Sequence, residues 1–317
     1  MSPALPGFEA LATGKKVTVA RALAGLETHT DDPALIDLLD AAWAAPKGHV
    51  VGITGPPGVG KSSLIHALIG LWRARGQTVA VIAVDPSSRR TGGALLGDRT
   101  RITADPDDTG IFIRSMAARD RLGGLADLTF PATILLRAVY DRIIVETVGV
   151  GQSETEIADI ADTVVFCVQP ASGDALQFMK AGIVEVPNIA VVTKADMGRV
   201  AERAKADFEG ALGLAVQNKA SWPVEVVLVS VRQSAGLGAL GDAVERHRSW
   251  LLADGAGRLS AQRGDQARTF LTQTIQDRFG REGVGWARRE GRLASTAQRS
   301  PFRIARDIAA DLAARFQ

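Results

Sequence analysis

The stretch GPPGVGKSS, residues 55 to 63, constrains this chain more than any other feature. It follows the apolar run HVVGIT and precedes the helical pattern SLIHALIGLWRARG. The spacing is that of a Walker A motif, and the motif lies in the strand, loop and helix context that phosphate binding requires. We therefore expect a phosphate-binding loop, to which seven residues contribute: Gly55, Gly58, Val59, Gly60, Lys61, Ser62 and Ser63.

Each residue type in this loop has a physical reason. Glycines allow backbone N–H groups to turn toward phosphate oxygens, and the N-terminus of the following helix adds a favourable dipole. Lys61 is expected to bridge the β- and γ-phosphates, and the Ser62 hydroxyl is expected to bind Mg²⁺. A loop of this kind does not distinguish a kinase, an ATPase and a GTPase.

The rest of the chain predicts an α/β fold. Seven short apolar runs without polar alternation start near residues 49, 78, 111, 142, 163, 188 and 224, and helical patterns separate most of them. Such runs predict a mostly parallel central sheet with helices on both faces, as in P-loop NTPases. We expect a helical N-terminal extension over residues 1–47, a nucleotide-binding domain over 48–255 and a helical C-terminal extension over 256–317.

Two helices outside this core carry clear signals. Asp32 and Pro33 predict the start of a helix before the first strand. Near the C-terminus, Ile304, Ile308 and Leu312 recur every fourth residue, with Phe316 next in the row. This apolar stripe either packs on the chain's own core or forms an interface with a second subunit, and the sequence leaves both open.

Composition narrows the classes of function. The formal charge is +2, from 37 basic and 35 acidic residues, so a nucleic-acid-binding surface is not expected. The single cysteine, Cys167, lies in an apolar run, which predicts a buried thiol in a reducing compartment. No segment has a signal-peptide core or a run of apolar residues long enough to cross a membrane. We therefore expect a cytoplasmic protein without a membrane partner.

Carboxylates at predicted strand ends indicate a metal site. Glu146 ends the run RIIVE and is followed at the third position by Gly149, which is the Walker B and switch II arrangement with glutamate in place of aspartate. Asp85 ends the strand that follows the phosphate loop helix, and Asp98 lies in a glycine-rich segment. Together with Ser62, these carboxylates would give the oxygen-only ligands that suit Mg²⁺.

A second loop, VVTKADM, resembles the guanine-reading Asn-Lys-x-Asp motif except at Thr193. Asp196 is placed to accept hydrogen bonds from guanine N1 and N2, and the Lys194 stem can lie over the base. A later strand end at Ser230, followed by Val231 and Arg232, could meet guanine O6. An asparagine at this position usually ties the base loop to the phosphate loop and reaches the N7 edge of the base. Threonine is shorter and lacks the amide, so we expect weaker guanine-nucleotide binding without loss of specificity.

Other classes of protein share a phosphate-binding loop of this kind. A P-loop small-molecule kinase or ATPase with a diverged base-reading loop is the main alternative, although it gives no reason for Asp196. A nucleotide-binding module without hydrolysis is another. A nickel-insertion GTPase is disfavoured because one cysteine and four scattered histidines offer no metal-ligand spacing.

With these motifs in place, the chain resembles the MeaB/ArgK-type GTPases of the SIMIBI class, which are chaperones of adenosylcobalamin-dependent methylmalonyl-CoA mutase. The resemblance covers nearly the whole chain and is carried by VGITGPPGVGKSSLI, VDPSSRRTGGALLGDRTRI, FIRS, IIVETVGVGQSE and GDALQFMKAGI. The sequence departs from the family pattern at Thr193, and at Met116 and Ala117, where a Pro-Ser-type turn is common.

The resemblance implies further roles. Lys61, Ser62, Asp85, Asp98 and Glu146 match the family's phosphate and magnesium positions, and Lys194 and Asp196 match its base readers. Arg101 matches a switch-region arginine near the phosphates, while Gln152 follows switch II, where it would position water. Three residues match switch III, which would relay the nucleotide state to an acyl-CoA mutase: Asp174, Gln177 and Lys180. Similar proteins are homodimers that bind GTP or GDP with Mg²⁺ and hydrolyse GTP slowly without their partner.

Overall fold

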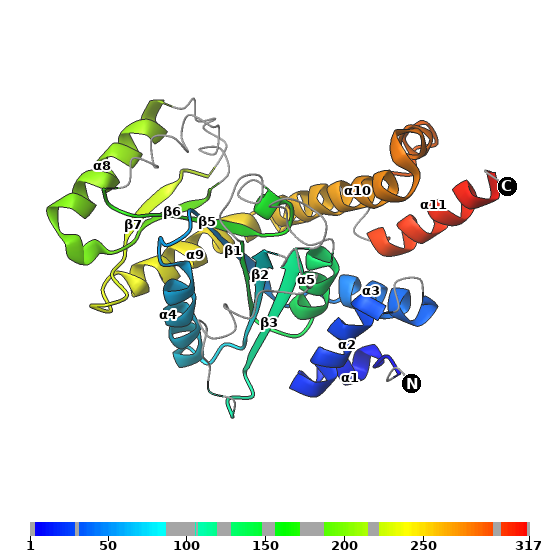
Figure 1. The fold of residues 1–317 in the computed structure, drawn as a ribbon, viewed down its shortest axis with the longest axis horizontal. Coiled ribbons are helices and arrows are strands. Elements are labelled where there is room, and N and C mark those ends of the chain that lie inside the picture. The colour runs from blue at the N-terminus through cyan, green and yellow to red at the C-terminus, as the bar shows by residue number, and fades with distance from the viewer. Residues whose placement is uncertain are drawn as a thin grey trace.

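The computed structural model describes residues 4–28, 32–86, 105, 107–118, 128–147, 156–171, 187–214, 222–293 and 299–315. A seven-stranded sheet lies at its centre (Figure 1). Its strands are β1 (His49–Thr54), β2 (Val79–Pro86), β3 (Ile111–Ala118), β4 (Arg142–Glu146), β5 (Thr163–Val168), β6 (Ile189–Val192) and β7 (Glu225–Leu228). All neighbouring strands are parallel, in the order β3-β2-β4-β1-β5-β6-β7, so the predicted fold class is confirmed.

Strand order places the chemistry-bearing strand ends together. β1, which leads into the phosphate loop, lies between β4 and β5, and Ile53 is paired with Glu146. β6, which leads into the base loop, is paired with β5. Because the carboxyl ends of parallel strands share one edge of the sheet, the loops that follow β1, β4, β5 and β6 meet there.

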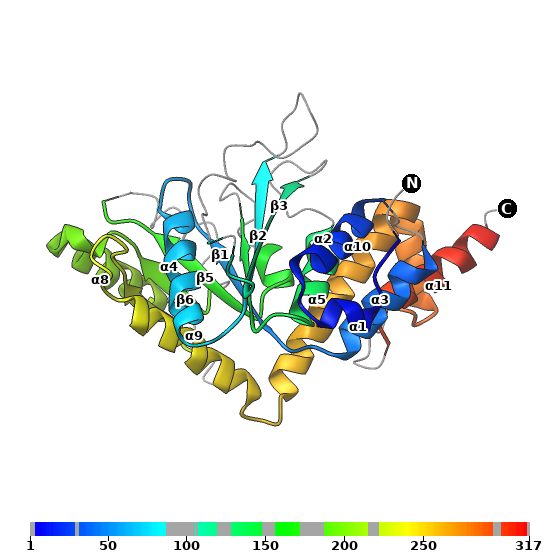
Figure 2. The same ribbon diagram turned by 90° about the horizontal axis from the view of Figure 1, so that it is seen from below.

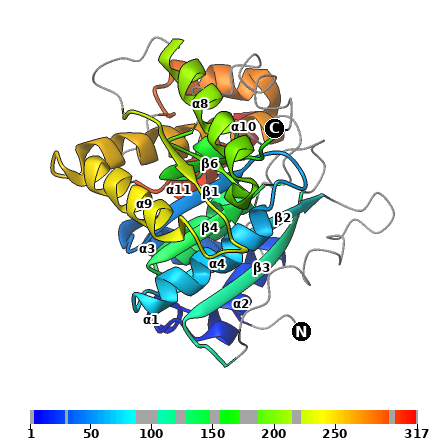
Figure 3. The same ribbon diagram turned by 90° about the vertical axis from the view of Figure 1, so that its left-hand side faces the viewer.

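Alternating side chains divide the core between the two faces of the sheet. Val51 and Ile53 face one cluster, in which they pack with α4 (Lys61–Ala74) and α9 (Leu237–Leu252). Val50 faces the other cluster, which contains α5 (Thr129–Arg137) and the N-terminal helices. α8 (Arg199–Leu214) covers β5 and β6 through Phe208 and Leu212. Helices thus cover both faces, and Figure 3 shows α4 and α9 lying along the same one.

The N-terminal helices α1 (Phe8–Ala12), α2 (Lys16–Thr28) and α3 (Pro33–Ala44) precede the sheet. α2 and α3 pack against α5, and α1 packs against α2 and α3. The predicted start of α3 is confirmed, because the Asp32 carboxylate accepts a hydrogen bond from the Ala34 N–H at 2.8 Å with Pro33 in the first turn. Two short 3₁₀ helices, η1 (Ile157–Asp159) and η3 (Ala195–Met197), come after β4 and β6, respectively.

The C-terminal helices α10 (Gly257–Arg289) and α11 (Pro301–Arg315) run beside α3 and α5 (Figure 2). Ile304, Ile308 and Leu312 are buried against α10 residues that include Leu271 and Ile275. The apolar stripe therefore packs within its own chain, which was one of the two expectations. None of the helices in the described ranges has an apolar stretch long enough to cross a membrane.

Candidate nucleotide-binding site

The phosphate loop requires glycine at the positions that the motif predicts. Gly55 has φ +135°, and a Cβ there would lie 2.3 Å from the carbonyl oxygen of Cys167 on β5. Gly58 and Gly60 have φ values of +76° and +104°, and Gly60 is the N-cap of α4. L-amino acids with side chains rarely adopt these conformations, so glycine allows the loop to turn tightly between β1 and α4.

Lys61 is held inside this loop. Its side chain is buried, and its ammonium donates hydrogen bonds to the carbonyl oxygens of Gly55 at 2.7 Å and Pro56 at 3.2 Å. These contacts keep a positive charge at the centre of the loop. The charge is therefore already placed where the phosphates of a nucleotide would lie.

Ser62 and Glu146 meet at the start of α4. The Ser62 hydroxyl donates to Glu146 Oε1 at 3.1 Å, which joins two of the four predicted magnesium ligands. The backbone of Asp85 lies at the end of β2, two residues beyond Ala83, which is paired with Glu146. A hydroxyl and a carboxylate at one strand edge are the hard oxygen donors that Mg²⁺ prefers, so the residues present fit the ion.

This pair is only part of a metal site. Among the side chains that the structure describes, no three His, Cys, Asp or Glu residues gather into a metal-binding group. The Asp85 side chain and the whole of Asp98 lie outside those described, so neither predicted ligand is tested.

A hydrogen bond that the sequence did not predict lies nearby. The hydroxyls of Thr54 and Thr147 are 2.8 Å apart and link the ends of β1 and β4.

Thr193 ties the base loop to the phosphate loop. Its hydroxyl is within hydrogen-bonding distance of the Val59 carbonyl at 2.8 Å and the Val168 carbonyl at 3.1 Å, and its N–H donates to Val168 at 2.8 Å. The side chain is 6% exposed. A tether between the two loops, which an asparagine usually makes, is thus made by threonine. The expected weakening of guanine-nucleotide binding stays a prediction.

Lys194 lies against the phosphate loop through a contact that the sequence did not predict. Its ammonium donates to Gln169 Oε1 at 2.7 Å and to the Gly58 carbonyl at 3.3 Å. The backbone of Lys194 has φ +54°, in the left-handed region. Gln169 directly follows β5. Its position at the carboxyl end of a strand is the feature of the sequence that could have marked it as a residue of the site.

Asp196 is oriented by Ser230. The Ser230 hydroxyl donates to Asp196 Oδ1 at 2.7 Å, and this hydrogen bond lowers the pKa of the Asp196 carboxyl. Ser230 is buried and is held by two backbone hydrogen bonds to Ala235, each of 3.0 Å. Val231 and Arg232 follow in the same turn, so these predicted base-contacting residues come together. An ionised carboxylate here can accept two hydrogen bonds, as guanine N1 and N2 require.

Several predicted residues lie outside the described ranges. They are Asp98, Arg101, Gly149 and Gln152 in the phosphate and switch segments, and Asp174, Gln177 and Lys180 in the segment identified with switch III. Their roles therefore stay predictions.

A buried polar network lies at the start of β5, away from the nucleotide site. Thr163 Oγ1 is 2.7 Å from His49 Nε2 and 2.8 Å from His247 Nδ1, and Asp162 binds Arg263 through two hydrogen bonds of 2.7 and 2.8 Å. Burial lowers the pKa of His49 to about 3 and that of His247 to about 4, so both are neutral at pH 7. This network has a structural role that spacing alone did not reveal.

Cys167 is fully buried, as its apolar surroundings predicted. Burial raises the pKa of the thiol to about 12. A protonated, inaccessible thiol is not a nucleophile, so Cys167 contributes to packing beneath the phosphate loop.

Comparisons with known proteins agree with this geometry. A family model described as methylmalonyl-CoA mutase-associated GTPase MeaB matches residues 19–284. A probable GTPase of Mycobacterium tuberculosis is 43% identical over 232 residues, covering 72% of this chain and 68% of that one. A putative GTPase of Pyrococcus horikoshii is 40% identical over 271 residues, covering 83% of each chain.

Two further relatives extend the match. The mouse protein named methylmalonic aciduria type A homolog, mitochondrial, is 34% identical over 286 residues, covering 85% of this chain and 68% of that one. A crystal structure titled LAO/AO transport system kinase has a TM-score of 0.66 and 27% identity, and 96% of each chain is covered. The chain therefore belongs to the family of methylmalonyl-CoA mutase-associated GTPases and is itself a GTPase.

Proposed function

We propose that this GTPase is a chaperone of an adenosylcobalamin-dependent acyl-CoA mutase, with methylmalonyl-CoA mutase as the first candidate. In this proposal it binds and hydrolyses GTP to gate cofactor loading and to protect or reactivate the mutase. The observation that carries it is a base loop with Asp196 oriented by Ser230 and tied to the phosphate loop through Thr193, in a chain of this family. The mouse relative is named after methylmalonic aciduria, which supports a partner that acts on a methylmalonyl group.

The residues divide the chemistry between them. Lys61 is proposed to hold the β- and γ-phosphates, while Ser62 and Glu146, with Asp85 and Asp98, would hold Mg²⁺, which would neutralise phosphate charge during hydrolysis. Asp196 would select guanine, and Lys194 would pack over the base. Gln152 and Arg101 are proposed to act on water and phosphate, respectively, and the Gly149 N–H to contact the γ-phosphate.

Regulation by the partner completes the proposal. The segment containing Asp174, Gln177 and Lys180 would report the nucleotide state to the mutase, and hydrolysis would be slow until the mutase binds. We further propose that the protein is a cytoplasmic homodimer that uses the C-terminal extension over residues 256–317. Since Ile304, Ile308 and Leu312 pack within their own chain, the interface would use other residues of that extension.

Cofactor transfer tests this function. Apo-methylmalonyl-CoA mutase from the same organism is mixed with adenosylcobalamin and with this protein in its GTP, GDP or nucleotide-free form. Mutase-bound cobalamin is then measured by absorbance after gel filtration. Loading is expected to differ between GTP and GDP, and Lys61→Ala is expected to remove the difference. Identical loading with and without the protein would contradict the chaperone role.

A kinase activity is the second candidate function, because the similar crystal structure is titled LAO/AO transport system kinase. A kinase transfers the γ-phosphate to an acceptor, whereas a GTPase releases it to water. GTP that carries the radiolabel in its γ-phosphate should therefore yield labelled inorganic phosphate as the sole labelled product, and a labelled organic or protein product would favour the kinase.

A further inference from the structure

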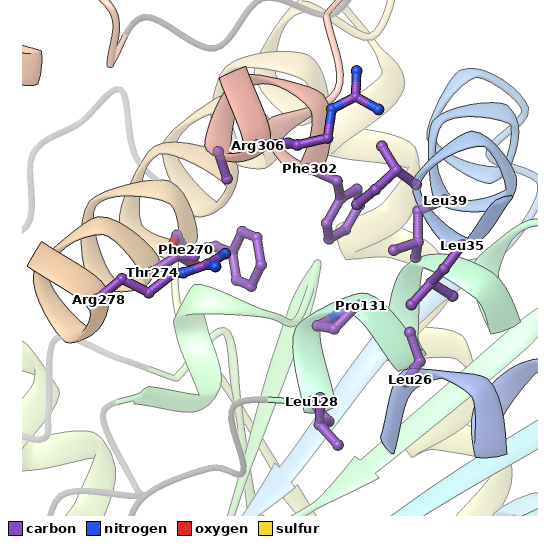
Figure 4. A pocket seen from close by; sticks show the side chains of 12 residues that line it. Leu26, Leu35, Leu39, Leu128, Pro131, Phe270, Thr274, Arg278, Phe302 and Arg306 are labelled. Carbon is purple, nitrogen blue, oxygen red and sulfur yellow. Dashed lines mark hydrogen bonds between the residues drawn. The ribbon is translucent and has the colours of Figure 1, made fainter. Parts of the chain in front are cut away.

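An apolar cavity lies between the N-terminal helices and the C-terminal helices, far along the chain from the nucleotide-binding residues. Its volume is about 490 Å³, and its walls include Leu26, Leu35, Leu39, Pro131, Phe270 and Phe302. Figure 4 shows Phe270 on one side and Leu35 and Leu39 on the other, with Pro131 below. The cavity thus joins α2, α3, α5, α10 and α11.

The size of the cavity is that of a ligand site. Protein interiors usually contain few voids larger than a water molecule, whereas small-molecule pockets measure about 300 to 1,000 Å³. Leu26, Leu35, Leu39 and Phe302 are each less than 9% exposed, so the apolar walls belong to the interior of the protein. A ligand with an apolar body would therefore lose most of its contact with water there.

The charged residues at the border of the cavity indicate which polar group a ligand with an apolar body would carry. Arg278 of α10 and Arg306 of α11 line it, while none of its lining residues in the described part of the chain is acidic. Asp307, which is not a lining residue, lies 3.6 Å from the Arg306 guanidinium, so a bound anion would share that group with it. Arg278 extends toward the Phe270 side of the cavity, and Arg306 lies at the opposite border from Leu128 (Figure 4). A guanidinium beside an apolar space attracts a carboxylate or a similar anion through charge-assisted hydrogen bonds.

The surrounding chain reinforces this sign of charge. From residue 257 to the end there are 12 arginines, no lysine and six acidic residues, which gives this part a formal charge of +6 against +2 for the whole chain. Long-range attraction therefore favours an anion at the tail helices. Guanidinium groups also hold carboxylates in a defined geometry, which adds selectivity to the attraction.

We propose that this cavity binds a small amphipathic anion, with its apolar body between Leu39, Phe270 and Phe302 and its charged group at Arg278 and Arg306. The ligand would have an apolar part of about the length of a ten-carbon chain, to suit a cavity of this size. Its binding would hold the C-terminal helices against α2, α3 and α5. The proposal is independent of the mutase and of nucleotide hydrolysis.

Calorimetry with the full, nucleotide-free chain tests the proposal. Decanoate is the probe, 1-decanol is its uncharged counterpart and decyltrimethylammonium is its cationic counterpart, all used below their micelle-forming concentrations. Decanoate is expected to bind with one site per chain and at least fivefold more tightly than either counterpart. No decanoate binding, or equal binding of the cation, would overturn the proposal.

Variants locate the site. Leu39→Trp fills the cavity from a buried position and Thr274→Trp from a half-buried one, so the second remains informative when the first does not fold. Each folded variant is expected to weaken decanoate binding at least tenfold. Combined Arg278→Gln and Arg306→Gln should weaken decanoate at least fivefold and leave decanol unchanged, whereas Arg315→Gln, exposed on α11 outside the cavity, should change neither.

A second copy of the chain is the competing occupant. Light scattering of the wild type and of Thr274→Trp, with and without decanoate, separates the two. If Thr274→Trp changes the oligomeric state while decanoate does not bind to the wild type, another copy fills the cavity and the ligand proposal is wrong. An unchanged oligomeric state together with lost decanoate binding supports the ligand site.

Discussion

The hydroxyl of Thr193 lies 2.8 Å from the carbonyl oxygen of Val59 and donates a hydrogen bond to it. This contact joins the loop that reads the base to the loop that binds the phosphates. A contact that fixes the two loops to each other would lower the conformational entropy that is lost when a nucleotide binds. Threonine therefore makes the tether usually given to asparagine. Because it lacks the amide, we do not expect it to contact the N7 edge of the base.

Replacing Thr193 by valine removes this hydroxyl at nearly constant shape. We expect GDP affinity to fall about two- to tenfold, the range for loss of one hydrogen bond. Thr193→Ser keeps the hydroxyl and should stay near the wild type, whereas Thr193→Asn, which restores an amide, should bind GDP more tightly. Calorimetric titration with GDP and Mg²⁺ measures all three. An unchanged GDP affinity of Thr193→Asn would show that an amide at this position adds no contact to the base.

Asp196 should determine which base is selected. Asp196→Asn replaces one acceptor oxygen by an NH₂ donor, which no longer suits the guanine 2-amino group but does suit the 2-carbonyl of xanthine. We expect GDP binding to weaken at least about tenfold and XDP binding to strengthen, because the NH₂ donor of the variant would face the 2-amino donor of guanine but the 2-carbonyl acceptor of xanthine.

Competition of GDP, XDP and ADP against a fluorescent GDP analogue measures this selection. Ser230→Ala is a companion variant that removes the 2.7 Å hydrogen bond to Asp196 but keeps its carboxylate. It should lower GDP affinity without raising XDP affinity. A gain of ADP binding in Asp196→Asn would indicate that another group selects the base.

Gly55 should tolerate no side chain. Gly55→Ala places a Cβ 2.3 Å from the Cys167 carbonyl oxygen, at a residue whose φ is +135°. We expect the free energy of unfolding to fall by about 2 to 4 kcal/mol, and nucleotide binding to be lost as well. Gly70→Ala in α4 is the matched control, because nothing lies within 4 Å of its Cβ and helical alanine is favoured by about 0.5 to 1 kcal/mol. Thermal unfolding should shift in opposite directions for the two variants, and equal shifts would contradict the steric argument.

The buried histidines predict a pH dependence of stability. His49 and His247 have folded-state pKa values of about 3 and about 4, below their unfolded value near 6.5. The unfolded chain therefore binds more protons as pH falls from 6.5 toward 4, and stability is lost over that window. Between pH 7 and pH 5 each histidine is expected to cost about 2 kcal/mol.

Denaturant unfolding at pH 7 and pH 5 measures this loss. His247→Gln, which keeps hydrogen-bonding capacity near Thr163 but cannot titrate, should reduce the loss by about 2 kcal/mol. His66→Gln is the control, since His66 is exposed on α4 and makes no part of the network. The same pH dependence in wild type and His247→Gln would show that other groups control acid stability.

Much of the fold follows from local sequence patterns. Apolar runs without alternation predicted all seven strands, and Asp32 with Pro33 predicted the start of α3, because buried parallel strands and capped helices leave strong local signals. The order of the strands needed the structure. So did the apolar stripe of α11, since periodicity shows that a face is covered but does not show what covers it.

The nucleotide site was predictable where its residues lie in one contiguous motif, because the local backbone then fixes their side chains relative to one another. Lys61 and Ser62 follow from a contiguous loop, and Ser62 does meet Glu146 from another strand. The contacts of Thr193 with Val59 and of Lys194 with Gln169 were not predicted, because they join segments 134 and 25 residues apart. Such long-range contacts depend on strand order, which no local pattern encodes.

Control of hydrolysis by the mutase is the central claim, and phosphate release tests it directly. GTP turnover is measured with and without adenosylcobalamin-loaded methylmalonyl-CoA mutase, for the wild type and for Glu146→Gln, in which a weakened magnesium site should slow turnover at least about 100-fold. We expect the mutase to accelerate GTP turnover by the wild type at least about tenfold and not to restore turnover by the variant. Equal wild-type turnover at every mutase concentration would contradict control of hydrolysis by the mutase.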